Sequence, residues 1–251
     1  MHHNLKKCLS CFLQFSTFSA LMLGISLLLG NLLFQNDARS ASADTSPEMV
    51  YTVIIDAGHG GRDGGASADD DGTLEKDLNL AVAKKLEALL KTANVRVVMT
   101  REHDVELASP DSDHKKRDDL NARLTIAEEA ENAIFVSIHM NKFPVAKYSG
   151  LQVYYSPNHE KSVSLAERIQ ADAASWSVGN ARRPKAADDN IYLLYHMEIP
   201  AVLVECGFLS NAEECALLSE PSYRQKLALV LFDAICLNLE RGTCESAENG
   251  V

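Results

Sequence analysis

The sequence has few basic residues for its acidic content. It carries 24 Lys and Arg residues against 35 Asp and Glu residues, a formal net charge of −11 at pH 7. Proteins that bind nucleic acid need clustered cations to displace the counterions of the phosphate backbone. The longest basic groups, 115–117 and 182–185, are flanked by acids or interrupted. We therefore expect no nucleic-acid partner.

The six cysteines do not follow the spacing of a zinc or disulfide framework. Cys8 and Cys11 form a C-x-x-C pair, but both precede an apolar run near the N-terminus, so a redox or zinc role is not expected. Cys215 and Cys244 are the one pair that we consider for a disulfide. The sequence does not decide whether that bridge forms.

Long apolar runs are missing beyond the N-terminal segment. There, Lys6 and Lys7 precede an apolar run at 18–34, and Ala41-Ser-Ala43 follows. A cleaved signal peptide has an apolar region of about 7–15 residues, whereas a membrane-spanning helix needs about 20. The run falls between these lengths, so residues 1–43 are predicted to be a signal peptide or a signal anchor. Both place the rest of the chain outside the cytoplasmic membrane, with membrane contact only through this segment.

Internal repeats and a second folded module are also absent. Residues 44–49 are predicted to be a linker, 50–241 one folded domain and 242–251 a C-terminal tail. A hydrophobic content of 46% over 251 residues is enough to bury one good core. Within 50–241, apolar strands alternate with amphipathic helices, which favours an α/β fold with a largely parallel sheet covered on both faces.

The expected elements are six strands and five helices. The strands are predicted at Val50–Asp56, Val95–Thr100, Ile134–His139, Leu151–Tyr155, Ile191–Leu194 and Ala201–Glu205. The helices are predicted at Leu74–Lys91, Arg117–Glu131, Ser162–Ala174, Ala212–Leu218 and Ser222–Glu240.

Three apolar strands end near a residue that can bind a metal ion or move a proton. His59 follows the first strand in a glycine loop, His139 ends the third, and Glu205 ends the last. The carboxyl ends of parallel strands line one crevice, where ligands bind. Glu75 joins them from the first turn of a helix that Thr73 is expected to cap.

Two imidazoles and a carboxylate around an open position form the His2Glu set of catalytic zinc hydrolases, in which the metal lowers the pKa of bound water to about 7. We assign His59, Glu75 and His139 to Zn2+, because Glu75 can close back over the strand end that carries His59. Glu205 reaches the site from a different strand, and we assign it to general base and acid catalysis. An exchange of roles between the two glutamates stays open. Asp56 and Asn141 are expected to orient the ligands.

Each of these residues has a simpler interpretation when it is taken alone. A lone histidine is more often structural, by roughly two to one, but joint placement at strand ends with two glutamates reverses these odds. Glu75 alone would be an ordinary acid in a first helical turn. Glu205 is harder to dismiss, because it ends a strand with a buried pattern and a carboxylate there needs a partner.

Four motifs occur in an order that is similar to a known family. They are the glycine loop of His59, the segment Leu74-Glu-Lys-Asp-Leu-Asn-Leu80, Ser137-Ile-His-Met-Asn141 and Val204-Glu-Cys-Gly-Phe-Leu-Ser-Asn211. Together they resemble the zinc-dependent N-acetylmuramoyl-L-alanine amidases of the Amidase_3 family, over a stretch from about Tyr51 to Glu240. Arg123 and the segments 182–185 and 191–194 resemble the spore-cortex, germination-related branch in particular.

The resemblance implies a twisted six-stranded sheet with helices around it, and an enzyme that uses Zn2+. The substrate would be peptidoglycan, cut at the amide between the lactyl group of N-acetylmuramic acid and L-alanine, with Glu205 as the proton carrier. Met140 departs from the family, because many relatives have a small residue there, but this leaves the ligands intact. Apart from the resemblance, Arg182, Arg183 and Lys185 are expected to form part of a solvated face, with a role in holding acidic stem peptides as the alternative.

The resemblance also bears on regulation. Some relatives carry a helical insertion that blocks the zinc, and the segment between Tyr155 and Ile191 is too short for it. Control is then expected from expression, location or an activating protein partner. We expect a monomer.

Two alternatives remain. Zinc carboxypeptidase-like exopeptidases use a short His-x-x-Glu spacing, which the sequence after His59 lacks. A non-catalytic peptidoglycan-binding protein that keeps the amidase fold would be signalled by a lost ligand or a lost base. All four residues are present, so an enzyme is the favoured prediction.

Overall fold

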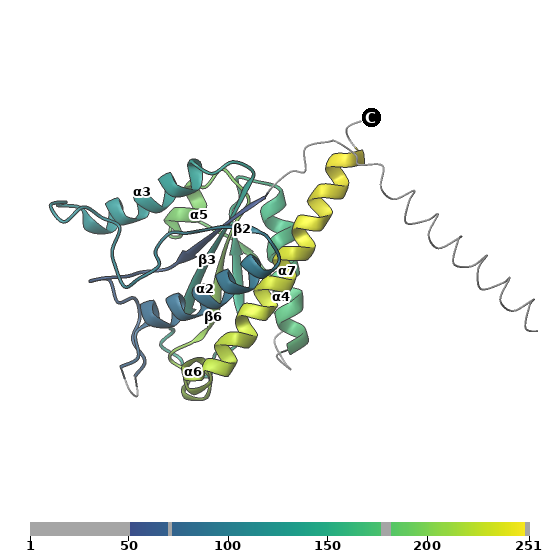
Figure 1. Ribbon diagram of the computed structural model, residues 1–251. Helices are drawn as coiled ribbons and strands as arrows, with labels where there is room; N and C mark the ends of the chain where they lie inside the picture. The colour runs from purple at the N-terminus through teal and green to yellow at the C-terminus, as the bar shows by residue number, and fades with distance from the viewer. Residues whose placement is uncertain (1–50, 70–71, 177–181, 249–251) are drawn as a thin grey trace, which may run out of the picture. The chain divides into compact units, whose positions relative to one another are not determined.

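A six-stranded sheet with the strand order β2-β1-β3-β6-β4-β5 organises the chain (Figure 1). The computed structural model describes residues 51–69, 72–176 and 182–248, so the predicted leader 1–43 and linker 44–49 lie outside it. The strands are β1 Thr52–Ala57, β2 Arg96–Met99, β3 Ala133–Asn141, β4 Gln152–Tyr155, β5 Lys185–Ala186 and β6 Ala201–Phe208. The helices are α2 Glu75–Thr92, α3 Lys115–Glu128, α4 Lys161–Trp176, α5 Tyr192–His196, α6 Ala212–Ser219 and α7 Pro221–Glu248.

The sheet is mostly parallel. The neighbours β2, β1, β3 and β6 all run parallel, and only β4 runs antiparallel to β6. The short edge strand β5 is parallel to β4. The predicted α/β class and the six-stranded, mostly parallel sheet are confirmed.

Helices cover both faces of the sheet, and the pleat of the strands separates two cores. On one face, Val53, Val136 and Val204 pack with residues of α2, α4 and α7. On the other face, Ile54 and Phe135 pack with residues of α3 and α5. Figure 1 shows α2, α4 and α7 on one side and α3 and α5 on the other. Each of these side chains is fully buried, which contributes about 1.5–3 kcal/mol per large apolar residue.

The start of α2 is fixed by the glycine loop and not by a side-chain cap. The N-cap residue is Leu74, without a capping hydrogen bond, so the prediction that Thr73 caps this helix was wrong. Instead, the amide of Glu75 donates to the carbonyl of Ala66 at 2.8 Å, and the amide of Lys76 donates to the carbonyl of Gly64 at 3.2 Å. The loop after β1 thereby satisfies amides that a helix start leaves without partners. The same two bonds hold Glu75 against that loop.

Two element predictions differ from the structure. Residues 191–194 were predicted to be a strand, but 192–196 form helix α5, in which Leu193 and Leu194 face the second core. A short apolar run does not separate a buried strand from a buried helix turn. The strand that the sequence did not predict is β5, Lys185–Ala186, whose exposed residues give no hydrophobic signal. Helix α7 continues to Glu248, beyond its predicted end and into the segment 242–251.

Two further predictions concern the chain termini. Cys215 is buried in α6, whereas the side chain of Cys244 lies outside the described residues, so the structure does not test the disulfide considered for this pair. Within the part of the chain that the structure describes, no helix is both long and apolar enough to cross a membrane.

Candidate metal centre

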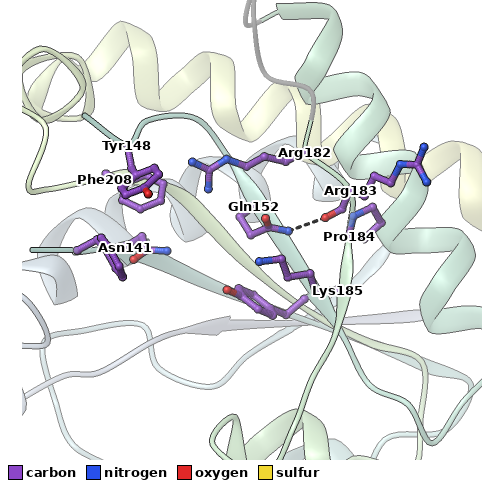
Figure 2. Close-up of a pocket in the computed structure, with 10 residues that line it drawn as sticks. Asn141, Tyr148, Gln152, Arg182, Arg183, Pro184, Lys185 and Phe208 are labelled. Atoms are coloured by element: carbon purple, nitrogen blue, oxygen red, sulfur yellow. Dashed lines mark hydrogen bonds between the residues drawn. The ribbon is translucent and has the colours of Figure 1, made fainter. Parts of the chain in front are cut away.

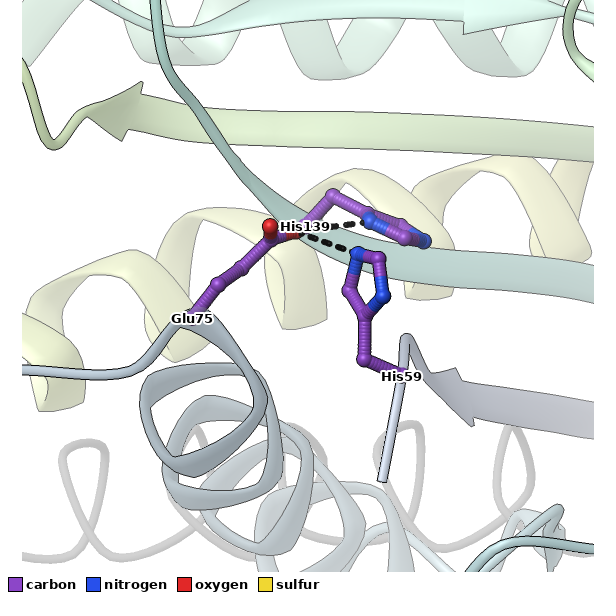
Figure 3. Close-up of side chains that lie close together, drawn as sticks. All are labelled: His59, Glu75 and His139. Carbon is purple, nitrogen blue, oxygen red and sulfur yellow. Dashed lines mark hydrogen bonds and ion pairs between the residues drawn. The ribbon is translucent and has the colours of Figure 1, made fainter. Parts of the chain in front are cut away.

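His59, Glu75 and His139 meet at the carboxyl ends of β1 and β3 (Figure 3). One oxygen of Glu75, Oε1, lies 3.1 Å from Nε2 of His59 and 2.9 Å from Nδ1 of His139. One donor atom from each residue lies within 4.8 Å of the other two. Two imidazole nitrogens and a carboxylate oxygen at this spacing fit a metal ion that prefers nitrogen and oxygen ligands.

The charges of this cluster favour the ionised form of Glu75. Burial alone would raise the pKa of Glu75, but hydrogen bonds and charge interactions with His139 and His59 hold it well below its ordinary value. Burial alone would lower the pKa of His59, but the hydrogen bond and the charge of Glu75, with a further contribution from Asp63, raise it. An ionised carboxylate beside two imidazoles is a ready ligand, since metal binding needs deprotonated carboxylates and displaces protons from histidines.

Glycines allow the backbone to approach the cluster closely. A Cβ atom on Gly58 would lie 2.3 Å from the ring of His139, and one on Gly65 would lie 2.6 Å from Oε2 of Glu75. His59 itself has a φ of 62°, a left-handed conformation that is uncommon outside glycine and clusters at functional sites.

Asp63 orients the imidazole of His59. Its Oδ2 accepts a hydrogen bond from Nδ1 of His59 at 2.9 Å, which turns Nε2 toward Glu75 and His139. Lys116 of α3 pairs with the same carboxylate. A carboxylate on the far nitrogen of a ligating histidine fixes its tautomer and raises its basicity. The sequence reasoning did not assign this role to Asp63, although the carboxylate four residues after His59 in the glycine loop was a usable signal.

A buried ion pair supports the backbone of His59. Asp56 is fully buried and pairs with Arg123 of α3, whose Nη1 and Nη2 donate to the carbonyls of Ala57 and His59 at 2.9 and 2.8 Å. Burial would raise the pKa of Asp56, but Arg123 and the hydroxyls of Ser137 and Thr100 lower it below its ordinary value. Asp56, predicted to orient the ligands, therefore acts on His59 through Arg123.

We expect Arg123→Met to lower the free energy of unfolding at pH 7 by about 3–5 kcal/mol, because it leaves the buried Asp56 carboxylate without its cation. In the wild type, the lowered pKa of Asp56 gives stability that is present above about pH 4 and is lost as the pH falls through the folded-state pKa. In the variant, burial raises that pKa, so stability falls as the pH rises. Urea unfolding at several pH values should therefore show that the difference in free energy of unfolding between wild type and variant becomes smaller toward acid pH.

The exposed pair of Lys91 and Glu87 provides the control for this experiment. Lys91→Met should leave the free energy of unfolding close to that of the wild type at every pH, because an ion pair at the surface contributes little to stability. If Arg123→Met lowered the free energy of unfolding by the same amount at every pH, the ion-pair explanation would be contradicted.

Glu205 lies beside His139 without joining the three-residue cluster. The two residues are register partners on β6 and β3, and Gln152 of β4 pairs with Glu205 on its other side. Oε2 of Glu205 is buried and has no hydrogen-bond partner among the described residues. Burial first, and then the charge of Glu75, raise its pKa to about 7, although His139 and His59 act in the opposite direction. A carboxylate in this state can exchange a proton near neutral pH.

Asn141 does not contact the three clustered side chains. Among the described residues, its side chain makes no recorded hydrogen bond to His59, Glu75 or His139, and it lines a neighbouring pocket instead. Asn79, which sequence reasoning missed, lies one helical turn after Glu75 and donates to the carbonyl of Gly58 at 3.1 Å.

A mostly parallel α/β sheet that ends in two histidines and a carboxylate, with a second carboxylate beside them, is an arrangement compatible with a hydrolase that uses a metal ion. Residues 53–236 match the family model Amidase_3, described as N-acetylmuramoyl-L-alanine amidase. This match spans most of the chain. The chain belongs to this family, and it is a hydrolase of the N-acetylmuramoyl-L-alanine amidase class.

Similar proteins agree with this assignment. The chain is 34% identical over 221 residues to the germination-specific N-acetylmuramoyl-L-alanine amidase of Bacillus subtilis, covering 85% of this chain and 91% of that protein. The CwlD amidase of Clostridioides difficile, solved in complex with the GerS lipoprotein, is 40% identical with a TM-score of 0.72, covering 75% of this chain and 98% of that one. The catalytic domain of the CwlV amidase from Bacillus (Paenibacillus) polymyxa is 32% identical, with a TM-score of 0.66 over 76% of this chain and 99% of that one.

Proposed function

We propose that His59, Glu75 and His139 hold Zn2+, and that Glu205 carries the proton in hydrolysis of the bond between N-acetylmuramic acid and L-alanine. The observation that carries this proposal is the contact of one Glu75 oxygen with both imidazoles, next to a buried Glu205 oxygen without a partner. The donor set of two nitrogens and one oxygen is that of catalytic zinc sites. The direct contacts of Glu75 favour it over Glu205 as the third ligand.

The residues of the chain then have separate tasks. Held by these residues, Zn2+ would supply a Lewis acid for the amide carbonyl and would lower the pKa of water toward neutral pH. Glu205 accepts a proton from the attacking water through its carboxylate and returns it to the departing amine of L-alanine. Asp63 holds the ring of His59, and Arg123 holds the backbone carbonyl of the same residue. The raised pKa of Glu205 suits a group that must both take and give a proton.

The biological setting is a proposal of the same kind. The germination-specific name of the Bacillus relative supports spore-cortex peptidoglycan as the substrate. An enzyme that acts on peptidoglycan works outside the cytoplasm. The N-terminal segment would export the domain, as a signal peptide or as a signal anchor. The complex of the Clostridioides relative with a lipoprotein supports a protein partner for this chain as well.

The test is a digest of purified peptidoglycan with zinc-loaded protein, followed by mass spectrometry of the products. Glycan strands without peptides, together with stem peptides that have a free N-terminal L-alanine, are the expected products. Cleavage within the peptide or within the glycan would reject the proposed bond. Metal analysis of the protein as purified identifies the ion.

We expect Asp63→Ala to weaken zinc affinity by about 10–100-fold, the range for loss of a carboxylate behind a ligating histidine. The measurement is a competition titration against a chromophoric chelator, with catalytic activity at saturating zinc as a second readout. Asp69→Ala is the matched control, because Asp69 is a loop carboxylate that pairs with Lys142 and not with a histidine. Equal zinc affinity of Asp63→Ala and the wild type would contradict this role.

A further inference from the structure

A pocket of about 530 Å³, shown in Figure 2, is lined in part by residues that neighbour the candidate metal centre in the sheet. Gln152, the register partner of Glu205, forms part of its lining, and so does Asn141, which follows His139 by two residues on β3. Its volume is in the range of pockets that bind small ligands. A molecule that is cut at the metal centre can therefore extend into this pocket.

An aromatic wall on one side of the pocket is held in place before any ligand binds. The wall includes Phe143 and Tyr148 from the loop between β3 and β4, and this loop is tied to the turn after β6. The amide of Phe143 donates to Oγ of Ser210 at 3.1 Å, and the amide of Gly150 donates to the buried Glu214 at 2.7 Å. A preformed wall reduces the entropy that binding costs.

Cations form the opposite side. Nη2 of Arg182 donates to the carbonyl of Ser149 at 2.9 Å, and its guanidinium lies 4.8 Å from the centre of the Phe208 ring, so the group is oriented. Lys185 is fixed by the pairing of β5 with β4 and has no carboxylate of the described residues within ion-pair distance. In Figure 2 the side chains of Arg182 and Lys185 point into the pocket, whereas Arg183 points away. In a chain with a net charge of −11, this positive lining attracts anions.

We propose that this pocket is a subsite for an acidic peptide, and that Arg182 and Lys185 bind its carboxylates. The inference rests on the proposed function and names the part of the substrate that the pocket takes. While the lactyl group is in amide linkage, the glycan side of the scissile bond carries no carboxylate. The peptide on the amine side does carry carboxylates, and aromatic side chains can pack against its aliphatic portions. The charge of the pocket therefore fits the peptide side.

The test compares N-acetylmuramyl-L-alanyl-D-glutamic acid with its diamide, in which both carboxyls are carboxamides. We expect the wild type to show a kcat/KM about tenfold higher for the diacid, with a preference that decreases as salt is added. Lys185→Gln and Arg182→Gln should each reduce the preference by about three- to fivefold. Lys226→Gln is the matched control, since Lys226 is exposed on α7, on the other face of the sheet. Equal kcat/KM values for diacid and diamide in the wild type would overturn the inference.

Binding of the product peptide L-alanyl-D-glutamic acid to the full chain separates the pocket from the reaction. One outcome is that the protein hydrolyses neither substrate, yet calorimetry shows that it binds the product peptide and that Lys185→Gln weakens this binding. That outcome would support the pocket and reject the proposed function. Hydrolysis of both substrates without a charge preference would reject the pocket and leave the proposed function intact. Unchanged melting temperatures of the variants ensure that these differences come from the pocket.

Discussion

Replacing Glu205 by glutamine is expected to lower kcat for amide hydrolysis by about 10²–10⁴-fold, the range that a positioned acid–base group contributes. Glutamine keeps the shape of the side chain but cannot accept a proton from water. The zinc content should remain that of the wild type, because His59, Glu75 and His139 are unchanged. Quantitative mass spectrometry of the released peptides, together with metal analysis, measures both effects.

The same substitution should stabilise the metal-free protein. Burial raises the pKa of Glu205 to about 7, so between its ordinary value and pH 7 the folded state binds a proton that the unfolded state has lost. Stability of the metal-free wild type therefore falls as the pH rises through this window, and the glutamine variant escapes that loss. At pH 8 we expect Glu205→Gln to be more stable by on the order of 1–3 kcal/mol, as measured by urea unfolding in the presence of a chelator.

Opposite effects on activity and stability distinguish a functional carboxylate from a structural one. Glu213→Gln, at an exposed position in the first turn of α6, is the matched control and should change neither quantity. Retention of more than about one tenth of kcat by Glu205→Gln would reject it as the proton carrier. The exchange of roles with Glu75 would then be the next hypothesis.

His139→Ala is expected to weaken zinc affinity by more than about 100-fold. Replacing a residue that only hydrogen-bonds to a metal ligand already weakens affinity by about 10–100-fold. The substitution removes one of only two nitrogen donors in the cluster and one of the two imidazoles that contact Glu75. Wild-type activity should disappear with a zinc chelator and return with added Zn2+, whereas the activity of the variant should not return. Added Zn2+ should also raise the melting temperature of the wild type, because an ion that binds only the folded state stabilises it.

The control for this substitution is His103→Ala, at an exposed position outside the cluster. It should keep the zinc affinity, the activity and the zinc-dependent rise in melting temperature. A His139→Ala variant that retains a full equivalent of zinc at low metal concentration would reject the proposed ligand set.

The large elements and the positions of the site residues were predictable from the sequence. Apolar runs that alternate with amphipathic helices indicate a parallel sheet, and strand ends in such a sheet meet at one edge. This is why His59 and His139 could be placed together without a structure. The stripe of Leu78, Val82 and Leu86 predicted α2 for the same reason, since these residues repeat with the period of a helix.

Predictions from local sequence were wrong where contacts with distant residues determine the structure. Thr73 has the chemistry of a cap, but carbonyls of the glycine loop take the amides at the start of α2. Residues 191–194 have a strand-like composition, yet their apolar side chains bury against the second core as a helix. The pair Lys185–Ala186 becomes a strand only because β4 offers it an open edge.

The sequence by itself determined the α/β class, through the periodicity of its apolar residues, and the family, through four motifs in order. It also predicted the four residues of the candidate site, from strand ends and from the first turn of a helix. Only the tertiary structure decided which glutamate touches both imidazoles, since that depends on where the glycine loop anchors α2. It also decided that Asp63 holds His59 and that Arg182 and Lys185 share a pocket with the aromatic loop. These contacts depend on residues that are far apart in the chain, or on a loop that orients the side chain. The direction of a side chain is set by tertiary packing, which no single segment of the sequence encodes.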